Sequence, residues 1–238
     1  MNIKIPSIVL LLISAGPLAA GVYPQAGIEY YSGSNSLALL TPWVAARFSL
    51  AQGMSLIFKY YDHNMRYDYQ GYDEAAEEFV NLQRKTHTSN LTTVLYAQKG
   101  KWTGYAAVSF MFGTDGYRAT AFDGGLGFAL TPKLTVEAGV YLLREDSVLW
   151  FPEDPVRKIN LYSVKANIKY KILPWLTLNP NIYLYRNSED VEAVSWSAGI
   201  ILTPFSPLAV TAYYFKYSES AQYKFSGDYL SVGLNLYF

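Results

Sequence analysis

The stretch YLSVGLNLYF, residues 229–238, decides the fold of this chain. Every second residue in it is apolar: Leu230, Val232, Leu234, Leu236 and Phe238. The residues between them are small, polar or tyrosine. In an extended strand, successive side chains point to opposite faces. A two-residue repeat of apolar residues therefore predicts a β-strand with one continuous apolar face.

The same period recurs along the chain. It is clearest in five segments: KWTGYAAVSFMF (101–112), LTVEAGVYLL (134–143), LYSVKANIKYKI (161–172), LTLNPNIYLY (176–185) and VSWSAGIIL (194–202). The connections between such segments alternate between five short turns, such as LTPK and ILPW, and six generally longer polar loops. Eleven alternating connections predict an all-β protein of about twelve antiparallel strands.

Composition narrows the classes of protein. The chain has 238 residues, 51% of them apolar, a formal net charge of +0 and no cysteine. A neutral chain gives no sign of nucleic-acid binding, and the lack of cysteine excludes disulfides and thiolate metal sites. Residues 1–21 combine Lys4, an apolar run and small residues, which predicts a secretory signal peptide. We expect residues 22–238 to form one barrel domain.

Two barrel architectures use such strands, and they differ in the direction of the apolar face. A soluble barrel turns it inward, whereas an outer-membrane barrel turns it toward lipid and lines its lumen with the polar face. The polar faces carry charges at mid-strand, such as Glu137 and Lys165. Aromatic residues gather near the strand ends, as membrane interfaces favour. They are Trp102, Trp175, Phe205 and Phe238 at the short-turn end and Tyr60, Phe112, Trp150 and Tyr185 at the loop end. These features favour a transmembrane up-and-down barrel.

The terminal stretch resembles the C-terminal signature of Gram-negative outer-membrane barrels, a terminal Phe preceded by alternating apolar residues. Phe238, Leu236, Leu234, Val232 and Leu230 occupy its positions. The resemblance implies location in the cell outer membrane, embedding in its lipid, and passage through periplasmic chaperones and the barrel-assembly machinery. It also implies periplasmic short turns and external loops. It identifies a class of protein and no single function.

The interior charges suggest a function. We expect five basic residues to line the lumen against two acidic ones, Glu29 and Glu137. The basic residues are Arg47, Lys59, Lys165, Lys169 and Lys171. Glu137 should neighbour Lys169, whereas Lys165 and Lys171 have no evident partner. Because unpaired charge needs water, this predicts a narrow, hydrated, mildly anion-favouring channel for small solutes. The alternative is a filled barrel with a structural or partner-anchoring role.

The stretch KTHTSN raises a third function. His87 and Ser89 share a lipid-facing side near the outer end of a strand, and with Asn90 they resemble the His-x-Ser-Asn stretch of outer-membrane phospholipase and lipid A deacylase barrels. That resemblance implies a His base and a Ser nucleophile. The residue that orients the His in those families corresponds to Lys101, which accepts no hydrogen bond. Asp62 or Asn64 is a conceivable substitute. We expect no working catalytic pair and no enzyme.

The remaining polar features indicate no cofactor. Asp73, Glu74, Glu77 and Glu78 form an acidic run that we interpret as a solvated loop and not a metal site. His63 is interpreted as a rim residue, and no nucleotide, haem or zinc spacing is present. We expect a monomer that binds no nucleic acid and no cofactor.

Overall fold

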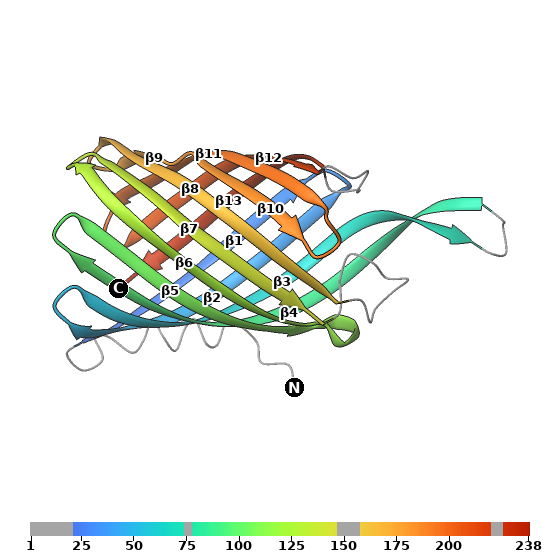
Figure 1. Cartoon of the computed structure of the whole chain (residues 1–238), viewed down its shortest axis with the longest axis horizontal. Helices are drawn as coiled ribbons and strands as arrows, with labels where there is room; N and C mark the ends of the chain where they lie inside the picture. Colours follow the sequence, from blue (N-terminus) through green and yellow to red (C-terminus); the bar gives the residue numbers. More distant parts are fainter. Residues whose placement is uncertain (1–20, 74–77, 147–157, 220–225) are drawn as a thin grey trace.

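The computed structural model describes residues 21–73, 78–146, 158–219 and 226–238, which form a closed antiparallel barrel (Figure 1). This confirms the predicted all-β fold. The strands are β1 (Val22–Gly33), β2 (Leu37–Ala51), β3 (Met54–Asp73), β4 (Glu78–Lys99), β5 (Trp102–Gly113), β6 (Arg118–Thr131), β7 (Leu134–Glu145), β8 (Ile159–Leu173), β9 (Leu176–Leu178), β10 (Asn181–Asn187), β11 (Glu192–Phe205), β12 (Leu208–Glu219) and β13 (Gly227–Tyr237). A short 3₁₀ turn, η1 (Thr114–Gly116), connects β5 to β6.

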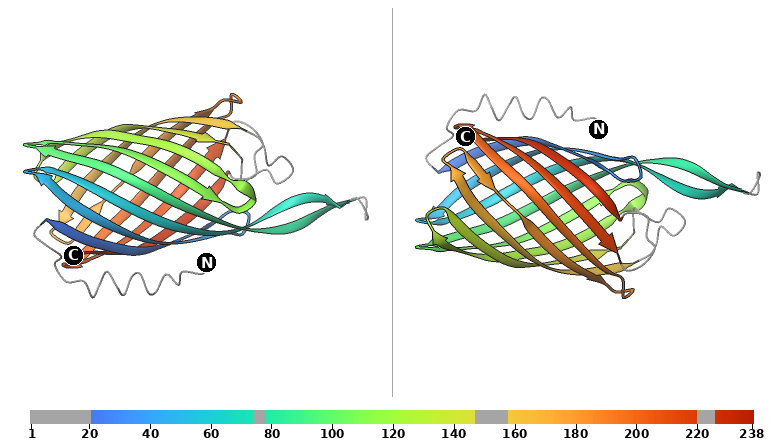
Figure 2. Two further views of the ribbon diagram at one scale, coloured as in Figure 1. Left: turned by 90° about the horizontal axis from the view of Figure 1, so that it is seen from below. Right: turned by 90° about the horizontal axis from the view of Figure 1, so that it is seen from above.

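The barrel closes by pairing its last strand with its first. β13 pairs with β1 from Gln25 opposite Tyr237 to Gly33 opposite Tyr229. The other strands pair with their neighbours in sequence, except that β9 and β10 both lie between β8 and β11. Closure leaves no strand edge without a partner, which a strand in hydrocarbon requires. The prediction that the C-terminal strand pairs with the first mature strand is confirmed, and Figure 2 shows the strands tilted around the closed wall.

The barrel has twelve strands because β9 and β10 form one interrupted strand. Both lie between β8 and β11, and both keep the same register with β8. The interruption falls at Pro180, which has no backbone N–H to donate to the ladder. The side-chain amide of Asn179 instead donates to the Ile168 carbonyl oxygen at 3.0 Å. All five short connections have two residues and lie at one end, as predicted.

The outer face of the wall is apolar. Outward side chains that are at least 40% exposed occur on strands all around the barrel, among them Leu126 (66%), Leu230 (58%) and Val232 (53%). Such a surface suits a bilayer and not water. The four aromatic residues predicted at the short-turn end are all exposed there. Tyr185, predicted for the loop-end girdle, is instead an interior residue, because on β10 it alternates with the outward Leu184.

Inside the wall, aromatic rings lie over glycines of the neighbouring strand. Four such pairs stand directly opposite in register: Gly27 with Trp43, Gly33 with Tyr229, Gly125 with Tyr105, and Gly199 with Tyr213. A Cβ on Gly199 would lie 2.0 Å from Tyr213 Cδ1, and one on Gly27 would lie 2.6 Å from the Trp43 ring. The missing side chains therefore let these rings lie flat against the wall.

One hairpin projects far beyond the barrel. β3 and β4 pair from Met54 opposite Ala97 out to Asp73 opposite Glu78, and their outer ends extend past the other strands (Figure 1). Two expectations lie outside the described residues: the signal peptide over residues 1–20, and Glu74 and Glu77 of the acidic run. Trp150 lies outside them as well. In the described part of the chain, no helix is long and apolar enough to cross a membrane.

Candidate functional site: the barrel interior

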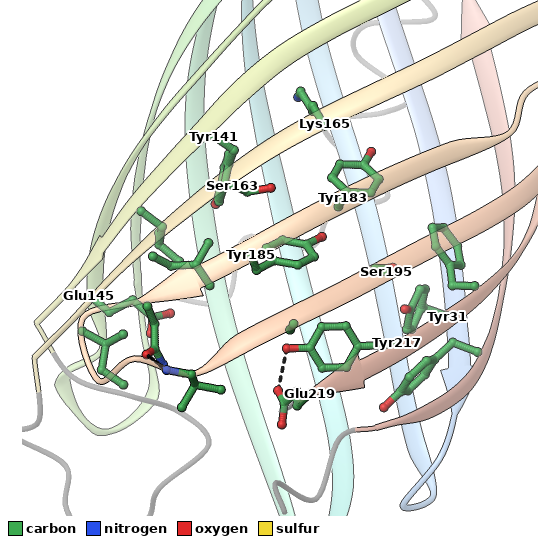
Figure 3. A pocket seen from close by; sticks show the side chains of 18 of the residues that line it. Tyr31, Tyr141, Glu145, Ser163, Lys165, Tyr183, Tyr185, Ser195, Tyr217 and Glu219 are labelled. Carbon is green, nitrogen blue, oxygen red and sulfur yellow. Dashed lines mark hydrogen bonds between the residues drawn. The ribbon is translucent and has the colours of Figure 1, made fainter. Parts of the chain in front are cut away.

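A cavity of about 710 Å³ occupies the loop half of the interior (Figure 3). It reaches from the β10–β11 loop, at Glu189 and Val191, down to Asp123 and Lys165 near mid-barrel. We call this cavity the vestibule. Its lining comes from ten of the strands and is mostly apolar and aromatic. On the side of the barrel that includes β2, β3, β6 and β13, a packed cluster of side chains fills part of the interior. This cluster includes the fully buried Tyr67.

One wall of the vestibule is aromatic. It runs over the adjacent strands β10, β11, β12, β13 and β1. Tyr31 stacks on Tyr229, with ring centroids 5.5 Å apart, and also meets Phe215 at 5.5 Å. Tyr185 lies edge-on to Tyr217 with centroids 6.1 Å apart. The sequence pattern places these side chains together because each occupies an inward position near the loop end of its strand.

Two glutamates flank this wall at the loop end. Glu145, the last residue of β7, accepts a hydrogen bond from the Tyr117 hydroxyl at 3.0 Å. Glu219, the last residue of β12, accepts one from the Tyr217 hydroxyl at 2.5 Å (Figure 3). The second carboxylate oxygen of Glu219 is buried, and none of the described residues forms a hydrogen bond with it. Among the described residues, neither carboxylate has a cationic partner.

An ion pair closes the bottom of the vestibule. Lys165 Nζ lies 2.6 and 2.8 Å from the two carboxylate oxygens of Asp123. The Tyr105 hydroxyl donates to the same carboxylate at 2.9 Å, and the ammonium lies 5.3 Å from the Tyr105 ring centroid. The expectation that Lys165 has no partner is wrong. Asp123 comes from β6, two strands away, and meets Lys165 across Gly139, where no side chain intervenes.

The short-turn half of the interior carries most of the basic residues. Lys169 Nζ lies 2.8 Å from Glu137, so the predicted pairing of these residues is confirmed. Arg47 Nε donates to Ser55 Oγ at 3.1 Å, and Lys59 lies 5.6 Å from the Trp43 ring. Lys171 is exposed at the short-turn end, and no described residue forms an ion pair with it.

Tight packing distinguishes this half from the vestibule. Ser55, Asn179 and Asn235 are at most 4% exposed there, whereas Trp43, at 5%, lies near mid-barrel. Asparagines bridge the strands: Asn179 Nδ2 donates to Asn167 Oδ1 at 3.0 Å, and the Tyr213 hydroxyl donates to Asn179 at 2.8 Å. Side chains of the wall thus make a constriction below the vestibule.

On the outer face, His87 contacts Asp62, one of the two residues that the sequence analysis named as a substitute for Lys101. His87 Nε2 hydrogen-bonds to Asp62 Oδ1, and Asn64 Nδ2 donates to the other Asp62 oxygen at 3.3 Å. Asp62 therefore takes the place that Lys101 does not fill. Ser89 Oγ lies 3.1 Å from the Tyr60 hydroxyl, and no hydrogen bond joins these two described residues, His87 and Ser89, to each other. The serine is buried and is not activated by the imidazole in this arrangement.

Sequence reasoning missed three interior carboxylates: Asp123, Glu145 and Glu219. The signal was present, because Glu145 follows Glu137 by eight residues and so shares its face, and Glu219 shares the face of Tyr217. With them the interior holds as many carboxylates as basic residues. The count of five against two that underlay the anion preference is therefore wrong.

Comparisons with known proteins find similarity in structure alone. No family model matches the chain, and no curated protein sequence matches it. An outer-membrane channel from Pseudomonas putida F1 superposes with a TM-score of 0.68 at 11% identity, covering 93% of this chain and 97% of that one. The KdgM porin in complex with disordered oligogalacturonate gives 0.63 at 9%, covering 90% and 99%. The NanC porin gives 0.60 at 11%, covering 90% and 98%.

These identities establish a shared fold and no shared specificity. The chain has the fold of outer-membrane barrels, from its first strand to its last. Its closed wall and apolar outer face meet the two conditions for crossing a membrane with strands. The chain therefore has the fold and the apolar outer wall of an outer-membrane β-barrel.

Proposed function

We propose that the barrel is a narrow channel for small solutes. The observation that carries this proposal is the vestibule, a cavity of about 710 Å³ that enters a twelve-stranded barrel from its loop end. A barrel with only a structural role has no need of so large an internal space. The channels and porins with which the fold superposes support the same class of function. We expect the channel to work as a monomer.

The proposed selectivity differs between the two halves of the lumen. In the short-turn half four basic residues, Arg47, Lys59, Lys169 and Lys171, accompany two acidic ones, Glu29 and Glu137. This half keeps an excess of positive charge, whereas the lumen as a whole does not. We therefore place the mild preference for anions at the constriction, where low-dielectric walls strengthen the field of each charge.

Single-channel recording of the refolded, full-length barrel in a planar bilayer tests the proposal. We expect conductance, and under a KCl gradient a reversal potential on the anion side. The double variant Arg47→Gln, Lys169→Gln should move it toward cation selectivity, and the shift should shrink at high salt because the Debye length falls. Arg186→Gln, which changes an exposed loop-end cation, is the matched control. No conductance in the wild type would favour the filled, structural barrel.

We further propose that the outward row from Leu230 to Phe238 is the strand read during assembly. These side chains lie on the lipid face, and Phe238 N donates to the Pro24 carbonyl oxygen at 3.0 Å, at the seam of the barrel. Deleting Phe238 should lower the heat-modifiable, folded fraction in outer membranes. Replacing the outward Phe205, which lies at the same end, should leave that fraction unchanged. Equal folded fractions in both variants would contradict this role.

A further inference from the structure

The lining of the vestibule is acidic. It includes four carboxylates, Asp123, Glu145, Glu189 and Glu219, and one amine, Lys165. Lys165 is held by Asp123 at 2.6 and 2.8 Å, so its charge is already compensated. Among the described residues, Glu145 and Glu219 have only tyrosine hydroxyls as side-chain partners. Within the described part of the chain, Glu145 and Glu219 therefore carry negative charge that no described cation compensates, above a short-turn half that is richer in basic residues.

The carboxylates stand beside aromatic faces. Glu219 bonds to Tyr217, which meets Tyr185 at 6.1 Å, and Tyr185 stacks on Tyr183 at 5.9 Å with planes 11° apart (Figure 3). The negative face of a tyrosine ring attracts ammonium groups, and a nearby carboxylate adds to that attraction. Rings and apolar side chains supply most of the remaining lining, which suits the uncharged body of a solute.

We propose that the vestibule is a binding site for organic cations, that is, small solutes with an ammonium group on an apolar or aromatic body. The ammonium group binds at Glu219, the body packs on Tyr185 and Tyr217, and Glu145, on β7, adds negative charge to the same cavity. This proposal rests on the proposed channel and names the class of solute that its loop end admits. The buried, unpartnered Glu219 oxygen is the acceptor that such a cation satisfies.

The same chemistry disfavours acidic solutes at this end. A polyanion entering the vestibule would meet Glu145 and Glu219 before it reached any cation that is free to bind it. Like charge in a confined space of low dielectric opposes entry. With the inferred site, this barrel would favour cationic solutes at its loop end. A channel of the same fold whose whole lumen is basic would favour anionic ones.

Equilibrium binding to the refolded barrel in detergent tests the site without requiring conduction. Isothermal titration would compare benzyltrimethylammonium with phenylacetate, probes of similar size and opposite charge, at neutral pH. We expect the cation to bind about tenfold or more tightly than the anion, with an affinity that falls as salt is raised. Equal binding of the two probes, or binding of neither, would overturn the inference.

Variants then locate the binding. Glu145→Gln with Glu219→Gln should weaken benzyltrimethylammonium about tenfold, because both charges are lost and the shapes are kept. Tyr185→Leu should weaken it less. The controls are Glu192→Gln and Tyr162→Leu, which change the same residue types at exposed positions on the outer face. Unchanged affinity in the vestibule variants would contradict the proposed site.

Conductance recording separates failure of this inference from failure of the channel. Benzyltrimethylammonium added on the loop side should interrupt the current in brief blockades, and from the short-turn side it should do so far less. A conducting barrel that shows no blockade and no binding would leave the channel standing and remove the cation site. Binding without conductance would keep the site and remove the channel.

Discussion

The two halves of the lumen are built from the same strands, yet one is hollow and the other is packed. The vestibule has a volume of about 710 Å³, whereas below it Ser55, Asn179 and Asn235 are buried. The charges of the two halves differ as well, since carboxylates without a cationic partner among the described residues lie above and most of the basic residues lie below. The contrast shows that the number of strands alone does not set the bore of a barrel of this size.

The types of inward residue account for much of the difference. In the loop half, Tyr31, Tyr185 and Tyr217 contact rings of the same strand or of strands one or two away. In the short-turn half, Asn179 donates to Asn167 and accepts from the Tyr213 hydroxyl, so polar side chains tie the strands together. Solute selection in such a lumen follows from side chains and not from the fold.

Removing the interior ring of Trp43, near mid-barrel, should have the largest effect. Trp43→Ala removes a ring that is 5% exposed, so channel conductance should rise clearly while stability falls by about 3 kcal/mol. Leu161→Ala, which shortens a side chain lining the vestibule, should leave conductance near the wild-type value because that half is already open. Paired single-channel recordings and urea unfolding measure both effects. Equal conductance in the two variants would show that Trp43 does not limit the bore.

Disturbing a ring over its glycine should destabilise the wall. Gly199→Ala places a Cβ 2.0 Å from Tyr213 Cδ1, so we expect a loss of about 1–3 kcal/mol from overpacking. Gly104→Ala is the matched control, because its Cβ would meet only the flexible end of Leu126, at 3.2 Å. Urea midpoints of the detergent-folded proteins compare them. Similar midpoints would mean that the Tyr213 ring moves aside freely.

The ion pair of Lys165 and Asp123 lies between the two halves of the lumen. Neutralising each partner in turn should shift the reversal potential in opposite directions. Asp123→Asn leaves Lys165 without its carboxylate and should shift the reversal potential toward anions. Lys165→Gln leaves Asp123 uncompensated and should shift it toward cations by a similar amount. The double variant should restore a value near that of the wild type. Shifts in the same direction would contradict a direct electrostatic origin.

The smallest effect is expected on the lipid face. Ser89→Ala should leave phospholipid and lipid A turnover at background, because Ser89 contacts Tyr60 and not His87. Asp62→Asn, which weakens the contact that holds His87, should also change no turnover. Product analysis by mass spectrometry after incubation with mixed micelles measures this. Hydrolysis by the wild type that disappears in Ser89→Ala would make the barrel an enzyme.

Much of the architecture follows from local pattern. A period of two fixes which side chains share a face, so YLSVGLNLYF alone predicts an apolar, lipid-facing strand, and two-residue turns predict the strand order. The same reasoning assigns Lys165 and Lys169 to the interior. It also predicts the Lys169–Glu137 pair, because both residues lie a similar number of positions from the short turns on neighbouring strands. In the register they are diagonal neighbours, since Glu137 stands opposite Asn167.

Contacts between residues that no local pattern links depend on the folded structure. Lys165 meets Asp123 from 42 positions earlier and two strands away, and His87 meets Asp62 across a register that only the folded hairpin sets. The split of the lumen into a hollow half and a packed half has the same origin. Alternation tells which side of the wall a tyrosine takes, but the rotamer that lays its ring along the wall or across the bore depends on neighbours from other strands.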